Sequence, residues 1–253
     1  GLVGSEMCIR DRVSAPQKMG KTDRAWYALL LTQAKYKNYV SLENDSLIQV
    51  AVDYFEKNSD RERLAKSYFY TGCVYREQED ISTAINLYLK SLRTMPQGGD
   101  SVFLSMVYND LGDCYTDQNM EETARNMYKQ AYAINVSNHD TLRAFHNLNG
   151  IGGTFLLELQ LDSALNYYQQ ALEMALSLDY PVLLGAIYKN LSGVYNEQGE
   201  YGQANDCISR AMPYLLDIES LTSAYSLKGD ILYNLGKNCL LYTSPSPRDR
   251  TRS

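Results

Sequence analysis

Apolar residues recur along most of the chain at the spacing of one helical face. Around Gly112, the residues Tyr108, Leu111, Gly112 and Tyr115 stand at positions i, i+3, i+4 and i+7. A short polar stretch, residues 117–119, follows. A second segment then repeats the same spacing with Ala124, Met127, Tyr128 and Ala131. The pattern predicts two amphipathic helices joined by a turn.

The predicted helix pair repeats at an interval of 40 residues. One column holds Ala84, Ala124, Ala164 and Ala204, and the column four residues later holds Tyr88, Tyr128, Tyr168 and Ile208. Two earlier columns hold Gly72, Gly112, Gly152 and Ser192, and Tyr75, Tyr115, Phe155 and Tyr195. A fixed period of this length is typical of a solenoid, in which each unit packs on its neighbours. The small residues predict a close helix crossing with aromatic rings on either side.

The segment from Tyr188 to Ala204 (YKNLSGVYNEQGEYGQA) resembles the tetratricopeptide repeat. That repeat usually has a period of 34 residues, and the period of 40 resembles the longer repeats of kinesin light chains and of bacterial regulatory solenoids. The resemblance implies an all-α fold, a right-handed superhelical solenoid of antiparallel helix pairs.

We expect this solenoid to span residues 13–238, and helix-start signals support its division into units. Asp100 and Asp140 precede equivalent first helices, where an acceptor side chain caps the backbone, and Pro181 suits a first helical turn. The predicted units are 21–60, 61–100, 101–140, 141–180 and 181–218, with a truncated unit at 219–238. Because the truncated unit lacks a second helix, we expect it to expose Leu227, Ile231 and Leu232.

The two ends of the chain differ from the repeats. Residues 1–12 (GLVGSEMCIRDR) and 239–253 (CLLYTSPSPRDRTRS) resemble translated sequencing-adapter DNA. One short DNA segment, read on opposite strands, encodes both Met7–Arg12 and Cys239–Thr243. We therefore expect both ends to be non-native, and the native protein to continue beyond residue 238.

Net charge and cysteine spacing limit the partners and the compartment that fit this region. Residues 13–238 carry 19 basic and 27 acidic residues, a net charge of −8. This balance argues against a nucleic-acid surface, which needs a basic stripe, and favours a neutral or basic protein or peptide partner. No apolar run is long enough to span a membrane. The cysteines of this region, Cys73, Cys114 and Cys207, have no CxxC spacing, which favours a reducing compartment such as the cytoplasm.

The sequence predicts no catalytic, cofactor or metal site. His139 and His146 lie seven residues apart without the carboxylate of an HExxH motif. The glycine-rich stretch 150–153 lacks the GxGxxG order and the P-loop lysine. We therefore expect a protein that is not an enzyme.

The resemblance implies that the first helix of each unit lines a concave groove. Positions one and five beyond the first-helix aromatic column would face it, namely Phe69 and Cys73, Asn109 and Asp113, Asn149 and Gly153, Lys189 and Gly193. An asparagine side chain both donates and accepts, so a ladder of them could pair with a peptide backbone; Asn190 lies one place further. The predicted peptide-binding residues are Phe69, Asn109, Asp113, Asn149, Lys189 and Asn190.

Three functions remain open at this point. The first is a protein-interaction scaffold that binds a peptide or helix of a partner on its concave face. The alternative is the sensory half of a bacterial signalling or transcription-regulator protein whose membrane and output domains lie outside this sequence. The third is a solenoid accessory to a catalytic domain. Residues 13–238 do not distinguish the first from the second.

Overall fold

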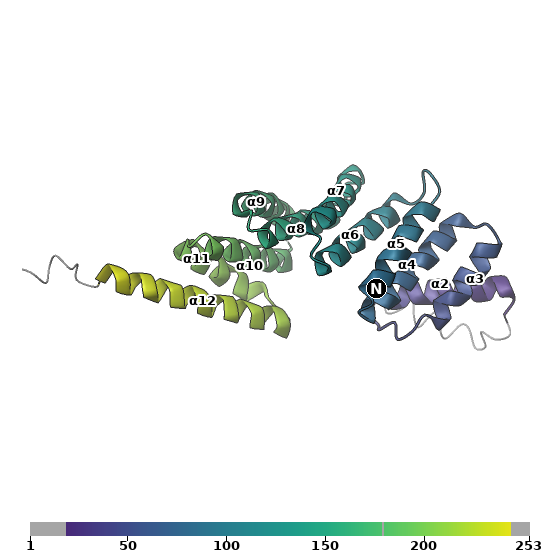
Figure 1. The fold of residues 1–253 in the computed structure, drawn as a ribbon, viewed down its shortest axis with the longest axis horizontal. Coiled ribbons are helices and arrows are strands. Elements are labelled where there is room, and N and C mark those ends of the chain that lie inside the picture. The colour runs from purple at the N-terminus through teal and green to yellow at the C-terminus, as the bar shows by residue number, and fades with distance from the viewer. Residues whose placement is uncertain (1–18, 179, 244–253) are drawn as a thin grey trace, which may run out of the picture. The chain divides into compact units, whose positions relative to one another are not determined.

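The structure, a computed structural model, describes residues 19–178 and 180–243, with side chains to residue 236. Within these ranges the regular structure is helical and there is no strand (Figure 1). The helices are α2 (Lys21–Lys37), α3 (Ser46–Lys57), α4 (Arg61–Glu77), α5 (Ile81–Thr94), α6 (Ser101–Asp117), α7 (Glu121–Ser137), α8 (Thr141–Leu157), α9 (Leu161–Leu178), α10 (Pro181–Glu197), α11 (Tyr201–Ala211) and α12 (Ile218–Thr243), with a short 3₁₀ turn η2 (Met212–Tyr214) after α11. The prediction of an all-α solenoid of helix pairs is confirmed.

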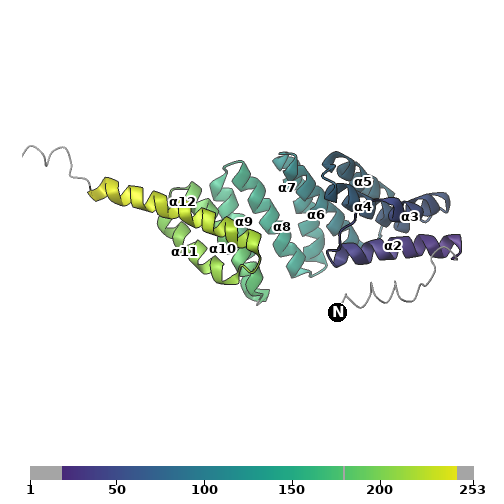
Figure 2. The same cartoon turned by 90° about the horizontal axis from the view of Figure 1, so that it is seen from below.

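The chain divides into two compact units between Ile134 and Asn135, and each is described by itself. In the first unit, α2 pairs with α3 and α4 with α5, and α2 also packs against α4 (Figure 2). In the second unit, α8 pairs with α9 and α10 with α11, while α12 packs on α11. Consecutive helices therefore form hairpins, and hairpins stack on the next pair along the chain.

The predicted foreign ends lie mostly beyond these elements. Residues 1–12 and 244–253 fall outside the described residues, and residues 239–243 continue α12. The prediction that α12 exposes three apolar side chains was only partly right. Leu232 is 51% exposed, but Ile231 is fully buried and Leu227 half-buried, because that face of α12 packs on the Ala204, Ile208 and Ala211 surface of α11.

The glycine column marks the closest helix crossings. A Cβ atom built on Gly72 or Gly112 would lie 2.5 Å from a ring carbon of Tyr88 or Tyr128, and one on Gly152 would lie 2.6 Å from the ring of Tyr168. No side chain fits in that space. In the next repeat serine replaces glycine, and the Ser192 Oγ donates to the Ala204 carbonyl at 2.7 Å. The predicted close crossing is confirmed in these pairs.

Helix starts and turns also follow the repeat. The carboxylates of Asp60, Asp80, Asp100 and Asp140 each accept a hydrogen bond from a backbone N–H three residues later. After each first helix the chain turns through a residue with positive φ: Tyr39, Glu79, Asn119, Leu159 and Gly199. These residues stand 40 apart. The same left-handed turn therefore reverses the chain in every hairpin, although only the last has the glycine that favours it.

Candidate functional site

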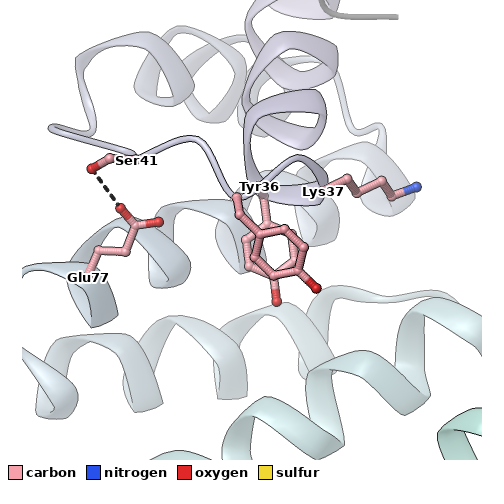
Figure 3. A pocket seen from close by; sticks show the side chains of 5 residues that line it. Tyr36, Lys37, Ser41 and Glu77 are labelled. Carbon is pink, nitrogen blue, oxygen red and sulfur yellow. Dashed lines mark hydrogen bonds between the residues drawn. The ribbon is translucent and has the colours of Figure 1, made fainter. Parts of the chain in front are cut away.

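A polar pocket opens in the first unit where helices α2, α4, α5 and α6 meet. Its volume is about 310 Å³. Its lining residues are Tyr36, Cys73, Arg76, Glu77, Tyr88 and Asp110, and we call it the Tyr36 pocket. A neighbouring outer pocket of about 520 Å³ shares Tyr36 and Glu77 and adds Lys37, Tyr39 and Ser41 (Figure 3).

Two carboxylates of α6 belong to this region: Asp110 lines the Tyr36 pocket, and Asp113 pairs with the lining residue Arg76. The Tyr36 hydroxyl donates to Asp110 Oδ2 at 3.0 Å, although the two residues are 74 positions apart. The Tyr128 hydroxyl donates to Asp113 Oδ1 at 2.7 Å, and the Arg76 guanidinium lies 3.4 Å from Asp113 Oδ2. Tyrosines from a first and a second helix thus hold the two acidic groups in place.

Glu77, at the end of α4, holds the loop beside the outer pocket in place. Its Oε2 accepts from the Leu42 backbone N–H at 2.7 Å. It also accepts from the Ser41 hydroxyl at 3.2 Å, a bond drawn in Figure 3. These bonds tie the α2–α3 loop to α4. In the same view, the Lys37 ammonium group extends away from Glu77, on the other side of the Tyr36 ring. The carboxylate therefore faces neutral donors.

Burial dominates the electrostatics of the Tyr36 pocket. Asp110 is only 7% exposed, and this burial, together with the neighbouring Asp113 charge, raises the pKa of Asp110 to about 6 against the opposing effect of Arg76. Burial also raises the pKa of Asp113, which Arg76 and Tyr128 partly offset. Burial raises the pKa of the Cys73 thiol as well, which favours its protonated form.

A second arrangement of polar groups lies in the second unit. The Asn190 Nδ2 on α10 donates to the Asn149 Oδ1 on the neighbouring first helix α8 at 2.7 Å. Both side chains are half-buried. The pair leaves the Asn149 amide N–H groups and the Asn190 carbonyl oxygen without a partner among the described residues. One amide pair thus presents both donors and an acceptor.

Lys189 lies next to Asn190 but lines a different pocket. This pocket has a volume of about 280 Å³ and combines apolar and charged groups from α10 and the α11–α12 connection. Its lining residues are Val182, Ala186, Lys189, Tyr214, Leu215, Leu216, Asp217 and Ser220. The hydrogen bonds that the Asp217 carboxylate accepts from Ser220 lower its pKa, and the positive charge of Lys189 adds to this effect.

The structure corrects one predicted site residue, Phe69. Its side chain is fully buried, and its ring packs edge-on against Tyr36, Tyr70 and Phe103 and beside Tyr88. The position one beyond the aromatic column points into the core here, because a large apolar side chain gains more from burial than from lining a groove. Phe69 therefore supports the pocket from behind.

The other predicted residues lie at or near polar surfaces. Asn109 and Asp113 are half-buried on α6, and the Asn109 side chain hydrogen-bonds to Asp110. The sequence reasoning missed Tyr36, Glu77 and Asp110. A signal was present: the column two beyond the aromatic position holds Tyr70, Asp110, Gly150 and Asn190. Asn190 of that column was predicted as a site residue, and the aspartate at the equivalent position, Asp110, could have been found in the same way.

Among the described residues, no group of three or more His, Cys, Asp or Glu side chains could hold a metal ion. None of the helices in the described ranges is long and apolar enough to cross a membrane.

Comparisons with known proteins identify the fold. No family model and no curated protein sequence matches the chain. Solved structures do match. The apo form of RapI has 14% sequence identity and a TM-score of 0.73, with 95% of this chain and 69% of that chain covered. NprR in complex with its cognate peptide NprX has 17% identity and a TM-score of 0.67, with 92% and 69% covered.

A third match broadens the comparison. The kinesin light chain repeats of Podosopora anserina, described as TPR-like, have 14% identity and a TM-score of 0.65, with 78% of this chain and 96% of that chain covered. NprR is a quorum sensor from B. thuringiensis. At these identities the likeness shows the fold alone. The chain is a TPR-like all-α solenoid.

Proposed function

We propose that this chain is an interaction module that binds a peptide segment of a partner along its first helices. The observation that carries the proposal is the Asn149–Asn190 pair. A peptide group in an extended chain has one donor and one acceptor, and the pair offers the complementary acceptor and donors from adjacent first helices. Main-chain pairing of this kind secures a peptide without depending on its side chains.

The comparisons support the same class of function. RapI and NprR share the fold, and the NprR structure holds a peptide. The excess of acidic residues in 13–238 favours a neutral or basic peptide, whose association would be faster at low salt. Asn109, Asp113 and Lys189 are further proposed contacts.

A peptide selection tests this function directly. A random heptapeptide display library would be selected on the purified full chain, and a selected sequence synthesised. Asn149→Ala and Asn190→Ala should each weaken its binding by roughly tenfold, since each removes hydrogen bonds to the peptide backbone. Asn166→Ala is the matched control, because Asn166 is an exposed asparagine on the second helix α9.

N-methylation of single peptide amides supplies an independent readout. Methylation of the amide that pairs with Asn190 should abolish binding, whereas methylation of others should not. Binding that tolerates both alanine variants and every methylated peptide would refute main-chain recognition on this face. Circular dichroism of each variant checks that the helical fold is retained.

The alternative function is a more specific version of the first. We propose, as a second candidate, that the module is the sensory part of a bacterial regulator and that its peptide is a signal. The likeness to the quorum sensor NprR favours this reading. Reading the source gene outward from residues 13 and 238 tests it, because a regulator requires an output domain or a membrane helix in the same reading frame.

A further inference from the structure

The Tyr36 pocket and its surroundings contain more negative than positive charge. Three carboxylates, Glu77, Asp110 and Asp113, lie in or beside the pocket, and the guanidinium of Arg76 is the one cationic group among its lining residues. Lys37 lines only the outer pocket, and its ammonium group extends away from Glu77 (Figure 3). One cation therefore stands against three carboxylates, and its ion pair is made with Asp113.

Asp110 is the carboxylate that most needs a cationic partner. Asp110 is only 7% exposed, yet its hydrogen bonds come from two neutral groups, the Tyr36 hydroxyl and the Asn109 amide. The ion pair of Arg76 is made with Asp113 instead. A buried carboxylate without an ion pair is costly, and a cation that entered the pocket would offset that cost.

The walls of the pocket also suit a cation. Tyr36 and Tyr88 both line it, and aromatic faces attract ammonium and guanidinium groups. A volume of about 310 Å³ is at the small end for ligand sites, so it can accept the end of one side chain or a chain terminus but not a large cofactor. An anion would meet the excess negative charge.

We propose that the Tyr36 pocket of the first unit binds a cationic nitrogen of a partner peptide, with Asp110 as its principal acceptor. This rests on the proposed function, since the peptide supplies the cation. Two sources share this chemistry: the side chain of an arginine or lysine, and a free N-terminal amine. Tyr36 positions the Asp110 carboxylate, and Glu77 provides a second negative charge at the entrance.

Small probes test the pocket without a known peptide. n-Butylguanidinium stands for an arginine side chain, glycinamide for a free N-terminus, and n-butylurea is the neutral counterpart of the first. In ¹H–¹⁵N NMR titrations of the full chain, n-butylguanidinium or glycinamide should shift the amide resonances of Arg76, Glu77 and Asp110. n-Butylurea should not. Equal shifts with n-butylurea would overturn the proposal.

Asp110→Asn should weaken binding of the cationic probe at least tenfold. The matched control is Asp117→Asn, which removes the same charge from an exposed position of the same helix and should change affinity less than twofold. Unchanged affinity in Asp110→Asn, or an equal loss in both variants, would contradict the assignment. A helical spectrum for each variant confirms that it folds.

Binding should also weaken as the pH falls. The titratable or charged groups that interact with Asp110 are Tyr36 on α2, Tyr70, Cys73 and Arg76 on α4, Tyr88 on α5, and Asp113 and Cys114 on α6. Because Asp110 has a pKa of about 6, only about a tenth of it is ionised at pH 5, and affinity should be about tenfold lower than at pH 7.5. No change over this range would overturn the role of Asp110.

Selected peptides separate this inference from the proposed function. Replacement of arginine by citrulline tests the side-chain source, and acetylation of the amine tests the N-terminal source. If peptides bind but tolerate both changes, the interaction module stands and the cation subsite falls. If n-butylguanidinium binds at Asp110 while no peptide can be selected, the subsite stands and peptide binding falls.

Discussion

Removal of the Asp110 charge should stabilise the protein at neutral pH. The ordinary pKa of this carboxyl is 3.8, and in the folded protein it is about 6. The folded state therefore retains a proton that the unfolded chain releases between these values, and stability falls as the pH rises from about 4 to about 6. At pH 7.5 the ionised Asp110 costs roughly 3 kcal/mol of folding free energy, but at pH 4.5 only about 1 kcal/mol.

Comparison of Asp110→Asn with the natural chain at two pH values isolates this cost. Any repacking around the new amide changes the stability of the variant by the same amount at both pH values. The change with pH in the stability difference between the variant and the natural chain therefore measures the cost of the Asp110 charge. The variant should gain about 2 kcal/mol relative to the natural chain between pH 4.5 and pH 7.5. The gain follows from burial, because a neutral amide has no charge to desolvate.

Urea unfolding followed by tryptophan fluorescence is the suitable assay. Trp26 is the only tryptophan in the chain and lies on α2, with the Arg63 guanidinium 3.8 Å from its ring centroid, so it reports on the first unit. Asp117→Asn, on the same helix, is the control. A stability difference that is the same at both pH values, or that changes equally in the control, would refute the reasoning.

Three further substitutions, two of them with a matched control, test the fold. Gly112→Ala should cost about 1–3 kcal/mol, because its Cβ would lie 2.5 Å from Tyr128, whereas Gly202→Ala, with open space around it, should stabilise by up to about 1 kcal/mol in chemical denaturation. Leu159→Gly should raise the free energy of unfolding by about 1 kcal/mol by relieving a positive φ. Leu157→Gly, at the last residue of α8, should lower it, and the same sign in both variants would contradict the turn argument. Phe69→Ala should cost about 3–5 kcal/mol and lower the melting temperature; a loss below 1 kcal/mol would mean that the core relaxes around the gap.

The repeat was predictable from the sequence because its packing is local. The glycine and tyrosine columns specify a crossing between two consecutive helices. Gly112 and Tyr128, which are 16 positions apart in the sequence, meet there as expected. The aspartate caps at Asp100 and Asp140 depend only on the next three residues. Such features need no knowledge of the rest of the chain.

The candidate site was less predictable because it depends on which side of a helix a given residue occupies. Phe69 and Asn109 share a repeat position, yet one lies in the core and the other at a polar surface, since side-chain chemistry decides between burial and exposure. Tyr36 comes from a first repeat whose pattern is irregular, and its bond to Asp110 joins helices two repeats apart. No periodicity in the sequence indicates that contact.

The reach of Tyr36 also bears on how the first unit folds. In a simple solenoid each repeat contacts only its immediate neighbours, and unfolding can begin at either end and proceed one hairpin at a time. The bond from α2 to α6 spans the intervening hairpin α4–α5, so loss of the first hairpin leaves the buried Asp110 without its tyrosine donor. Fraying at this end therefore disturbs the third hairpin as well as the second, and the three should melt as one cooperative block.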